Sequence, residues 1–294
     1  MLFLVELPSQ ILIKVALGAV IASIALSLVG TLIVQLKITN IGYSMSHAAF
    51  AGASFGIWLN AYMFPNFDEQ ITALIFTLIT ALILGPLSNK TKLSSEVILG
   101  ALFSLLTALG FIFLSTLPTG VITQRAVSVL WGSLFGLRYI DFLNLSFIII
   151  GFIIILTIYY REFLAIIFHE KIAMAAGIRV AMFKFLVLTI TALIVSISIK
   201  IVGALLVYAL IIMPTSTAYQ FLYDFKKILY ISPIFGAFSA ILGLFLSLTT
   251  NFPISSSMIL ISCIIFLIAV GLSPKRRILS KKDLNKKTTE KKMG

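Results

Sequence analysis

The chain has 294 residues, of which 60% are hydrophobic and 11% are charged. Soluble domains carry about 25% charged residues, so a water-facing surface cannot be built from this composition. An ordinary soluble enzyme is therefore excluded. The single cysteine, Cys263, also excludes an internal disulfide framework and a cysteine-rich zinc module.

Most of the net charge of +12 lies at the C-terminus. Residues 275–294 contain nine basic and two acidic side chains, whereas residues 1–274 hold no basic stripe interleaved with aromatic residues of the kind that binds nucleic acid. We therefore expect the basic residues to interact with membrane lipids and not with nucleic acid. The composition predicts a transmembrane domain over residues 1–274 and a disordered, basic cytoplasmic tail over residues 275–294.

Apolar runs long enough to cross a membrane recur along the whole chain. A helix needs about 20 residues to cross a hydrocarbon core about 30 Å thick. The runs predict an all-α, polytopic transmembrane helical bundle of eight to nine spans. The candidate spans lie near residues 11–35, 43–64, 70–88, 96–117, 142–160, 180–199, 202–222, 229–249 and 254–272.

The basic residues divide unequally between the two sides of the predicted bundle. Eighteen of the 22 lysine and arginine residues fall on the side that includes the C-terminal tail. Because such residues accumulate in short cytoplasmic loops, we expect a multi-pass protein of the cytoplasmic membrane with its C-terminus inside and its N-terminus outside. The other side, or a buried position, is left for Lys14, Arg125, Arg138 and Lys200.

Two segments do not fit simple spans. Residues 126–137 are apolar but too short to cross, and irregular backbone at such a depth survives only inside protein or beside a water-filled cavity. Residues 161–179 lie on the expected cytoplasmic side and are unusually apolar for a loop. Glu170 and Met174 are one helical turn apart and Gly177 can end a helix, so we predict a short amphipathic helix docked on a partner.

The chain lacks the motifs of two common enzyme classes. His169 and Glu170 open like the metalloprotease pattern HExxH, but Ala173 occupies the second histidine position. No glycine-rich phosphate loop of the form GxxxxGK followed by Ser or Thr occurs. We therefore expect no enzyme activity from this chain, and any ATP hydrolysis would belong to a separate subunit.

His47 is the clearest candidate for substrate contact, because it lies inside the second predicted span. An ionisable residue within a membrane span marks a substrate or ion pathway by default. The alternative is a neutral imidazole that shares hydrogen bonds with Ser44 or a neighbouring helix. Nearby, Gly52 and Gly56 are small residues four positions apart, a spacing typical of close helix packing.

The seventh predicted span contains a proline that should interrupt its helix. Pro214 removes one backbone hydrogen bond, and the hydroxyl of Thr215 could satisfy the freed carbonyl. Such breaks recur in transporters, and a purely structural kink is the alternative. Glu96, at the start of the fourth span, fits a structural role at a helix N-terminus.

Four motifs, taken in order, resemble those of the membrane permease of the divalent-metal ABC importer family, over residues 11–277. The family pattern DALSHAxLPG is similar to YSMSHAAFAG at residues 43–52. The pattern DPELARALGI is similar to residues 169–178, and VGxLLVxALLIxPAATA is similar to residues 202–218. A short LFG motif occurs at residues 134–136.

This resemblance implies a function, a fold and partners. The chain would be the permease subunit of an ATP-binding-cassette importer for zinc, manganese or iron, with a type II ABC importer-like fold. It would work as a homodimer around a central path, together with a cytoplasmic ABC ATPase and an extracytoplasmic solute-binding protein. Residues 169–178 would form the coupling helix that enters a groove of the ATPase. The implied coupling residues are Glu170, Ala173, Ala175, Ala176 and Gly177.

One departure from the family pattern bears on the cargo. The family has an aspartate at the position of Tyr43, one helical turn before His47, so that both residues face one side of the helix. A neutral tyrosine is a poorer ligand for a divalent cation than a carboxylate. We expect no resident cofactor, and a metal ion at His47 would be cargo. The candidate substrate path comprises Tyr43, Ser44, His47, Pro214 and Thr215.

Two other functions stay open on the sequence alone. An ion-coupled secondary transporter or channel would need no ATPase, but usually has more buried acids along its path. A membrane-embedded enzyme would need a catalytic constellation, and the incomplete HExxH pattern supplies none. A stable cytoplasmic ATPase partner would fit only the importer.

Overall fold

The computed structural model describes residues 9–90, 95–118, 129–130, 132 and 138–274. Within these ranges every helix or strand assigned is an α-helix, which confirms the predicted all-α bundle. The predictions for Arg125, for the LFG motif and for the basic tail concern residues outside the described ranges. The helices are α1 (Ser9–Gln35), α2 (Thr39–Tyr62), α3 (Glu69–Lys90), α4 (Ser95–Ser115), α6 (Tyr139–Ile158), α7 (Tyr160–Phe168), α8 (Glu170–Ala175), α9 (Val180–Val202), α10 (Ala204–Phe221), α11 (Phe225–Thr250) and α12 (Ile254–Leu272).

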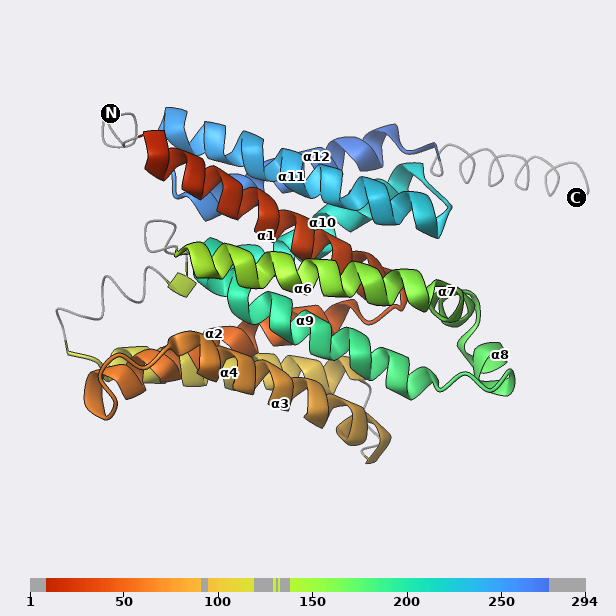
Figure 1. Ribbon diagram of the computed structural model, residues 1–294, viewed down its shortest axis with the longest axis horizontal. Helices are drawn as coiled ribbons and strands as arrows, with labels where there is room; N and C mark the ends of the chain where they lie inside the picture. Colours follow the sequence, from red (N-terminus) through yellow and green to blue (C-terminus); the bar gives the residue numbers. More distant parts are fainter. Residues whose placement is uncertain (1–8, 91–94, 119–128, 131, 133–137, 275–294) are drawn as a thin grey trace, which may run out of the picture.

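Long helices of alternating direction run along one common axis (Figure 1). In the described part of the chain, seven of them are long and apolar enough to cross a membrane, namely α1, α4, α6, α9, α10, α11 and α12. The other two long helices, α2 and α3, lie alongside and match the second and third predicted spans. The predicted spans therefore correspond to the long helices, with bounds shifted by a few residues.

Helix α2 is less apolar than its neighbours because protein, not lipid, surrounds much of it. It packs against α3, α4, α9 and α10. Ser44, Ser46 and Ser54 on this helix are fully buried. The hydroxyl of Ser46 donates to the Gly42 carbonyl at 2.9 Å, within the same helix. A helix enclosed in this way can carry polar side chains that a lipid-facing helix would exclude.

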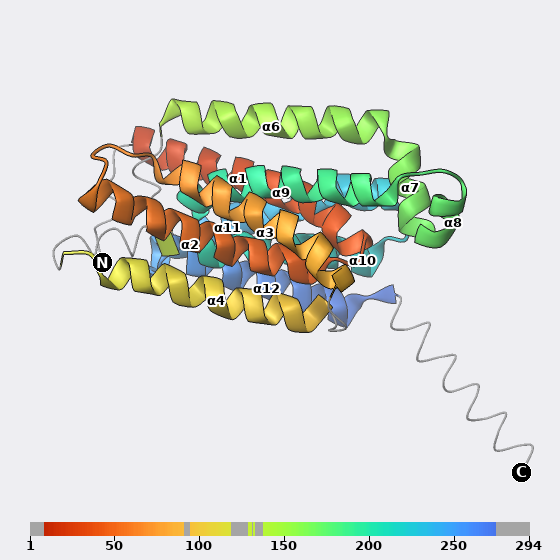
Figure 2. The same cartoon turned by 90° about the horizontal axis from the view of Figure 1, so that it is seen from below.

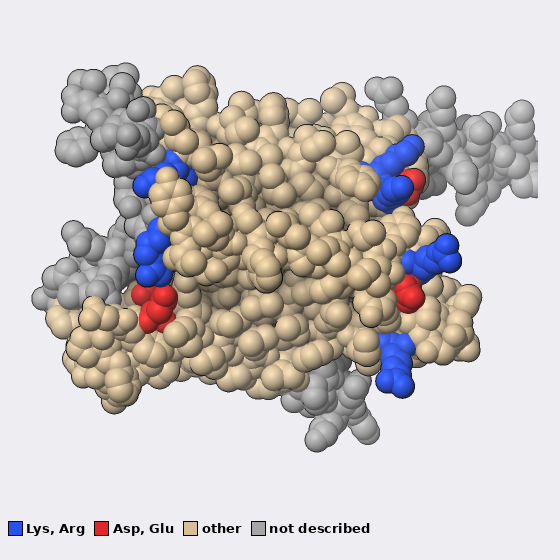
Figure 3. Space-filling view, viewed as in Figure 1, with Lys and Arg blue, Asp and Glu red and all other residues tan. Residues whose placement is uncertain are grey.

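On the face shown in Figure 3, charged side chains gather at the two ends of the bundle and leave a band without charges between them. This band fits a hydrocarbon core, from which unpaired charges are excluded. We call the end at which α1 begins the N-terminal end, and the end at which α12 stops the C-terminal end. The short helices α7 and α8 lie at the C-terminal end (Figure 1).

The long helices form two groups that α9 joins. One group contains α2, α3 and α4, and the other contains α1, α10, α11 and α12, while α9 packs against both α1 and α3 (Figure 1). Helix α6 lies outside these groups and contacts α1 and α9. It runs along one edge of the bundle, and α4 and α12 run along the opposite edge (Figure 2).

Small residues allow several of these helices to approach backbone to backbone. A methyl group added at Gly52 would overlap the Thr72 carbonyl oxygen, and one at Gly56 would overlap the Thr72 hydroxyl. The packing role predicted for this glycine pair is therefore confirmed at the contact of α2 and α3. Between α1 and α10, a methyl group at Gly30 would overlap the Ile211 carbonyl oxygen.

The segment at residues 161–179, for which one short helix was predicted, contains two helices. His169 has an extended backbone, with φ −159° and ψ 100°, and separates α7 from α8. The helix expected near residues 169–178 is present as α8, at Glu170–Ala175, and the extended backbone at His169 separates it from α7. Gly177 does end α8 as predicted, since its φ of +86° favours a residue without a side chain.

The described part of the short apolar segment at 126–137 is packed inside the protein. Val129 is 7% exposed and belongs to the main hydrophobic core. Gly132 has a φ of +84°, and a Cβ there would lie 2.6 Å from the Ile201 carbonyl oxygen, beside the Gly203 break between α9 and α10. These contacts agree with the expectation that irregular backbone at this depth is covered by protein.

Candidate functional site

His47 lies in a cluster of aromatic rings contributed by three helices. Its imidazole makes edge contacts with Tyr43 on α2 and with Phe103 on α4, at ring-centroid distances of 5.1 and 4.3 Å. Tyr43 also stacks on Phe103 and contacts Tyr208 on α10 at 4.7 Å. The sequence places Tyr43 and His47 on one helix face, and the structure confirms that their rings meet.

A hydroxyl on α4 fixes one nitrogen of this imidazole. The Thr107 hydroxyl lies 3.0 Å from Nδ1 of His47 and 2.7 Å from the Phe103 carbonyl oxygen. A hydroxyl has one proton, and donation of that proton to the carbonyl requires Nδ1 of His47 to donate to the hydroxyl. Nδ1 is then the protonated nitrogen, and Nε2 keeps the lone pair that a cation can bind.

The His47 cluster lies within the membrane-spanning part of the bundle. His47 is eight residues from the start of α2, which corresponds to about 12 Å from the C-terminal end of the bundle. Its side chain is partly exposed, and Tyr43 is 36% exposed. Among the described residues, no three His, Cys, Asp or Glu side chains come together to hold a metal ion.

The other candidate path residues lie in two different places. Ser44 is buried, and its hydroxyl donates to the Leu99 carbonyl on α4 at 3.2 Å, so it joins α2 to α4 beside the cluster. Thr215 is also buried, but its hydroxyl lies 2.8 Å from that of Ser232 on α11 and donates to the Ser27 carbonyl on α1. Pro214 is buried beside it. Thr215 thus contributes to packing of α1, α10 and α11, which favours the structural kink over a path role.

The second candidate surface lies at the C-terminal end, on α8. Glu170, Ala175, Ala176 and Gly177 are exposed, as a docking role requires. Ala173, by contrast, is 3% exposed and packs in the protein's own core, so its predicted contact with an ATPase does not fit this geometry. Glu170 also forms an ion pair with Lys184 of α9, at 2.7 Å, which ties α8 to the bundle.

The sequence predicts an apolar docking segment here, but it does not single out the large side chains that face outward. Phe168 is 79% exposed, Ile172 is 64% exposed and Met174 is 51% exposed. An apolar patch of this kind marks an interaction site. The surface borders a groove of about 610 Å³ that is also lined by Gln35, Leu36 and Lys37, at the end of α1. The signal in the sequence is a run of apolar residues beside charges, but only the fold shows which of them point outward.

Thr107 was also missed, although a threonine in an apolar span is visible in the sequence. Its partner His47 is sixty positions away, and the sequence does not say which helices are neighbours. Tyr208 falls inside the family-like segment at 202–218, but nothing in that segment indicates its contact with Tyr43.

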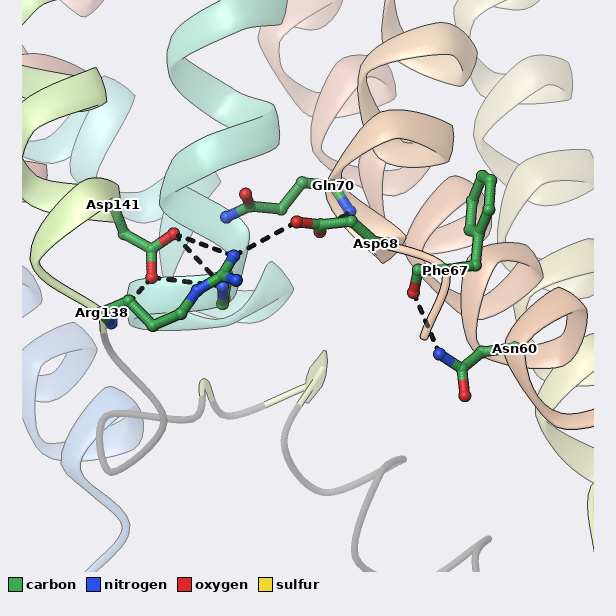
Figure 4. A network of polar contacts seen from close by, with 7 residues as sticks. Asn60, Phe67, Asp68, Gln70, Arg138 and Asp141 are labelled. Atoms are coloured by element: carbon green, nitrogen blue, oxygen red, sulfur yellow. Dashed lines mark hydrogen bonds and ion pairs between the residues drawn. The ribbon is translucent and has the colours of Figure 1, made fainter. Parts of the chain in front are cut away.

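A charge network ties three helices together at the N-terminal end (Figure 4). Asp141 of α6 is 1% exposed and pairs with Lys200 of α9, which is 12% exposed, at 3.2 Å. Arg138 lies between Asp141 and Asp68, and its guanidinium is 3.2 Å from the Asp68 carboxylate before α3. The Arg138 amide also donates to Asp141 at 2.9 Å. Burying a carboxylate is costly unless it is paired in this way, so the network ties α6 to α9 and to the start of α3.

Comparisons with known proteins extend over most of the chain. The profile of the ABC 3 transport family matches residues 9–273. The manganese transport system membrane protein MntC of Listeria innocua is 29% identical over 269 residues, which cover 92% of this chain and 93% of that protein. The chelated iron transport system membrane protein YfeC of Yersinia pestis is 28% identical over 239 residues, which cover 81% of this chain and 78% of that protein.

A solved structure has the same arrangement of helices. The structure of PsaBC from Streptococcus pneumoniae in complex with Fab matches with a TM-score of 0.80 and 25% identity, and the match covers 92% of this chain and 95% of that one. The fold, the apolar band and the family match agree with one another. This multi-pass membrane protein therefore belongs to the ABC 3 transport family.

Proposed function

We propose that this chain is the membrane permease subunit of an ATP-driven importer whose cargo is a divalent metal ion, with manganese, iron and zinc as candidates. The observation that carries the proposal is the His47 imidazole, which lies within the bundle and keeps a lone pair on Nε2 because Thr107 holds Nδ1. The names of the relatives, which are manganese and iron transport proteins, support this cargo class. The metal ion would be transported and not retained as a cofactor.

The cation path would lie between two copies of the chain. One copy would contribute the imidazole of His47 and the phenol of Tyr43, whose rings are in contact, and these are too few ligands for a stable metal complex. Because both side chains are partly exposed, a second copy facing them could supply a matching pair. A site of few, mostly neutral ligands binds the cation weakly enough to release it, as transport requires.

The ATPase would dock at the C-terminal end, which we assign to the cytoplasm. Among the described residues, basic side chains are more numerous at that end, in agreement with the positive-inside rule. The exposed side chains of Phe168, Ile172 and Met174 would enter a groove of the ATPase. A solute-binding protein would deliver the cation at the opposite end. ATP hydrolysis would take place in the ATPase and not in this chain.

Reconstitution tests the proposed function. The tagged full-length chain is purified from its own cells with any bound ATPase, incorporated into liposomes and supplied with radiolabelled manganese. We expect accumulation that depends on ATP on the side of the ATPase and that is lost in His47→Ala. Uptake driven by a proton gradient without ATP would contradict the importer and would identify a secondary transporter.

A further inference from the structure

A second binding site lies on the lipid-facing side of the bundle, away from His47. A groove of about 490 Å³ is formed by α1, α6, α11 and the first residue of α7. Two of its lining side chains are open to the surroundings, since Ile153 of α6 is 46% exposed and Tyr230 of α11 is 64% exposed. The groove therefore opens outward at the level of the membrane.

The groove is polar at one end and apolar at the other. The polar part of the groove lies toward the C-terminal end of the bundle, where α7 and α11 begin. It is lined by Tyr160, Lys226 and Tyr230. Leu28 and Pro233 form the deeper, apolar part. From Lys226 to Pro233 the helix rises over seven residues, or about 10 Å. Such a gradient matches an amphipathic molecule whose head lies at the interface and whose chains extend into the membrane.

The polar end favours a negatively charged head group. Within the described residues, Lys226 has no carboxylate partner in an ion pair, and its amide, not its ammonium group, contacts Asp224 at 2.9 Å. Tyr160 stacks on Phe225, which fixes its ring beside the groove. Burial, the nearby Asp224 and Tyr230 raise the pKa of Tyr160, so its hydroxyl keeps the proton that it can donate to a phosphate.

The position of the groove argues against a second copy of the chain as its occupant. His47 contacts α4, and α4 lies along the edge of the bundle opposite α6 (Figure 2). If two copies meet around His47, as the proposed function states, the groove beside α6 remains in contact with lipid. Lys226 and the two tyrosines then face the head groups of the leaflet in which α7 and α8 lie.

We infer that this groove binds one anionic phospholipid, whose phosphate contacts Lys226, Tyr160 and Tyr230 and whose acyl chains lie along Leu28 and Pro233. The bound lipid would contact α7 at its first residue, at the base of the segment that carries Phe168 and α8. The proposal concerns a lipid that is held specifically, and its test is independent of transport.

Native mass spectrometry of the full-length chain, delipidated in detergent, tests this inference. The probes are phosphatidylglycerol, phosphatidylcholine with the same acyl chains, and glycerol phosphate without chains. We expect one phosphatidylglycerol to be retained per chain, and about fivefold less phosphatidylcholine. Glycerol phosphate should not compete. Competition by glycerol phosphate, or equal retention of the two lipids, would overturn the proposal of an anionic phospholipid.

Three variants locate the site. Lys226→Glu should lower retention of phosphatidylglycerol by about tenfold or more, whereas Lys227→Glu should leave it unchanged, because Lys227 does not line the groove. Thr157→Trp keeps the charges but fills the groove from α6, so it should also abolish retention. Equal losses in Lys226→Glu and Lys227→Glu would show general charge attraction and would reject a specific groove. Manganese uptake is not measured here, so failure of the lipid site leaves the proposed import function untouched.

Discussion

The Thr107 hydroxyl on α4 lies 3.0 Å from Nδ1 of His47 on α2, and so determines which nitrogen of the imidazole can face a cation. This contact joins two helices whose residues are sixty positions apart. Partners that orient a metal-binding imidazole in this way contribute strongly to metal affinity. Thr107 is thus a positioning residue for the proposed cation site.

Loss of this hydroxyl should weaken cation transport without disturbing the fold. Thr107→Val keeps the shape of the side chain, and we expect the manganese concentration for half-maximal uptake to rise by about tenfold. Thr107→Ser should retain near-normal uptake. Thr189→Val is a matched control, because Thr189 on α9 is partly exposed and its hydroxyl bonds to the Phe185 carbonyl within its own helix. Normal uptake by Thr107→Val would show that the contact does not position His47.

Tyr43→Asp should tighten metal binding at the cluster. The change places a carboxylate one turn from His47, and a carboxylate binds divalent cations better than a phenol does. An uncompensated carboxylate within the membrane costs about 2.5 to 3.5 kcal/mol, so the variant should have a lower melting temperature without metal and recover when manganese is added. Tyr43→Phe serves as the control, and thermal unfolding with and without manganese is the measurement. No difference between the two variants in their response to manganese would place the cation path elsewhere.

Replacement of the last residue of α7 by aspartate should prevent the chain from binding the proposed ATPase. Phe168→Asp introduces a charge where we expect an apolar contact, and burying an unpaired carboxylate costs several kcal/mol, so co-purification of the ATPase should fail. Phe64→Asp is matched in residue type and exposure, at 59% against 79%, but lies at the opposite end of the bundle. It should leave the ATPase bound. Retention of the ATPase by Phe168→Asp would contradict the assigned docking surface.

The two acids of the N-terminal network should differ greatly in their effect on stability. Asp141→Asn leaves the nearly buried Lys200 without its anionic partner, and we expect a loss of about 3 to 5 kcal/mol. Asp68→Asn removes a pair in which Arg138 is 59% exposed, so the loss should stay within about 1 kcal/mol. Thermal or denaturant unfolding in detergent measures both. Equal losses would mean that burial of Asp141 does not govern this network.

Close packing of α1 and α10 should make Gly30 intolerant of a side chain. Gly30→Ala would force the two backbones apart at Ile211, and we expect a loss of about 1 to 3 kcal/mol in unfolding free energy. Gly151→Ala on α6 is the control, because nothing lies within 4 Å of an added methyl group there. It should be as stable as the parent chain or slightly more stable. The comparison requires only the melting temperatures of the two variants.

The sequence by itself determined the membrane class, the helical spans and the unequal distribution of charge. These properties are local, because each crossing helix must supply about 20 apolar residues and satisfy its own backbone. The position of His47 within a span, and the helix face that it shares with Tyr43, are local features as well. They depend only on the spacing of residues along one helix. The glycine pair at 52 and 56 was likewise visible as a packing surface.

The tertiary structure alone decided which helices are neighbours. Lipid is as apolar as the helices themselves, so no hydrophobic preference in the sequence pairs one helix with another, and small residues and buried hydrogen bonds decide instead. For this reason the partnership of His47 with Thr107, the pairing of Asp141 with Lys200 and the use of Thr215 for packing could not be predicted. The outward direction of Phe168 and the inward direction of Ala173 also depend on how α7 and α8 are packed against the ends of the long helices.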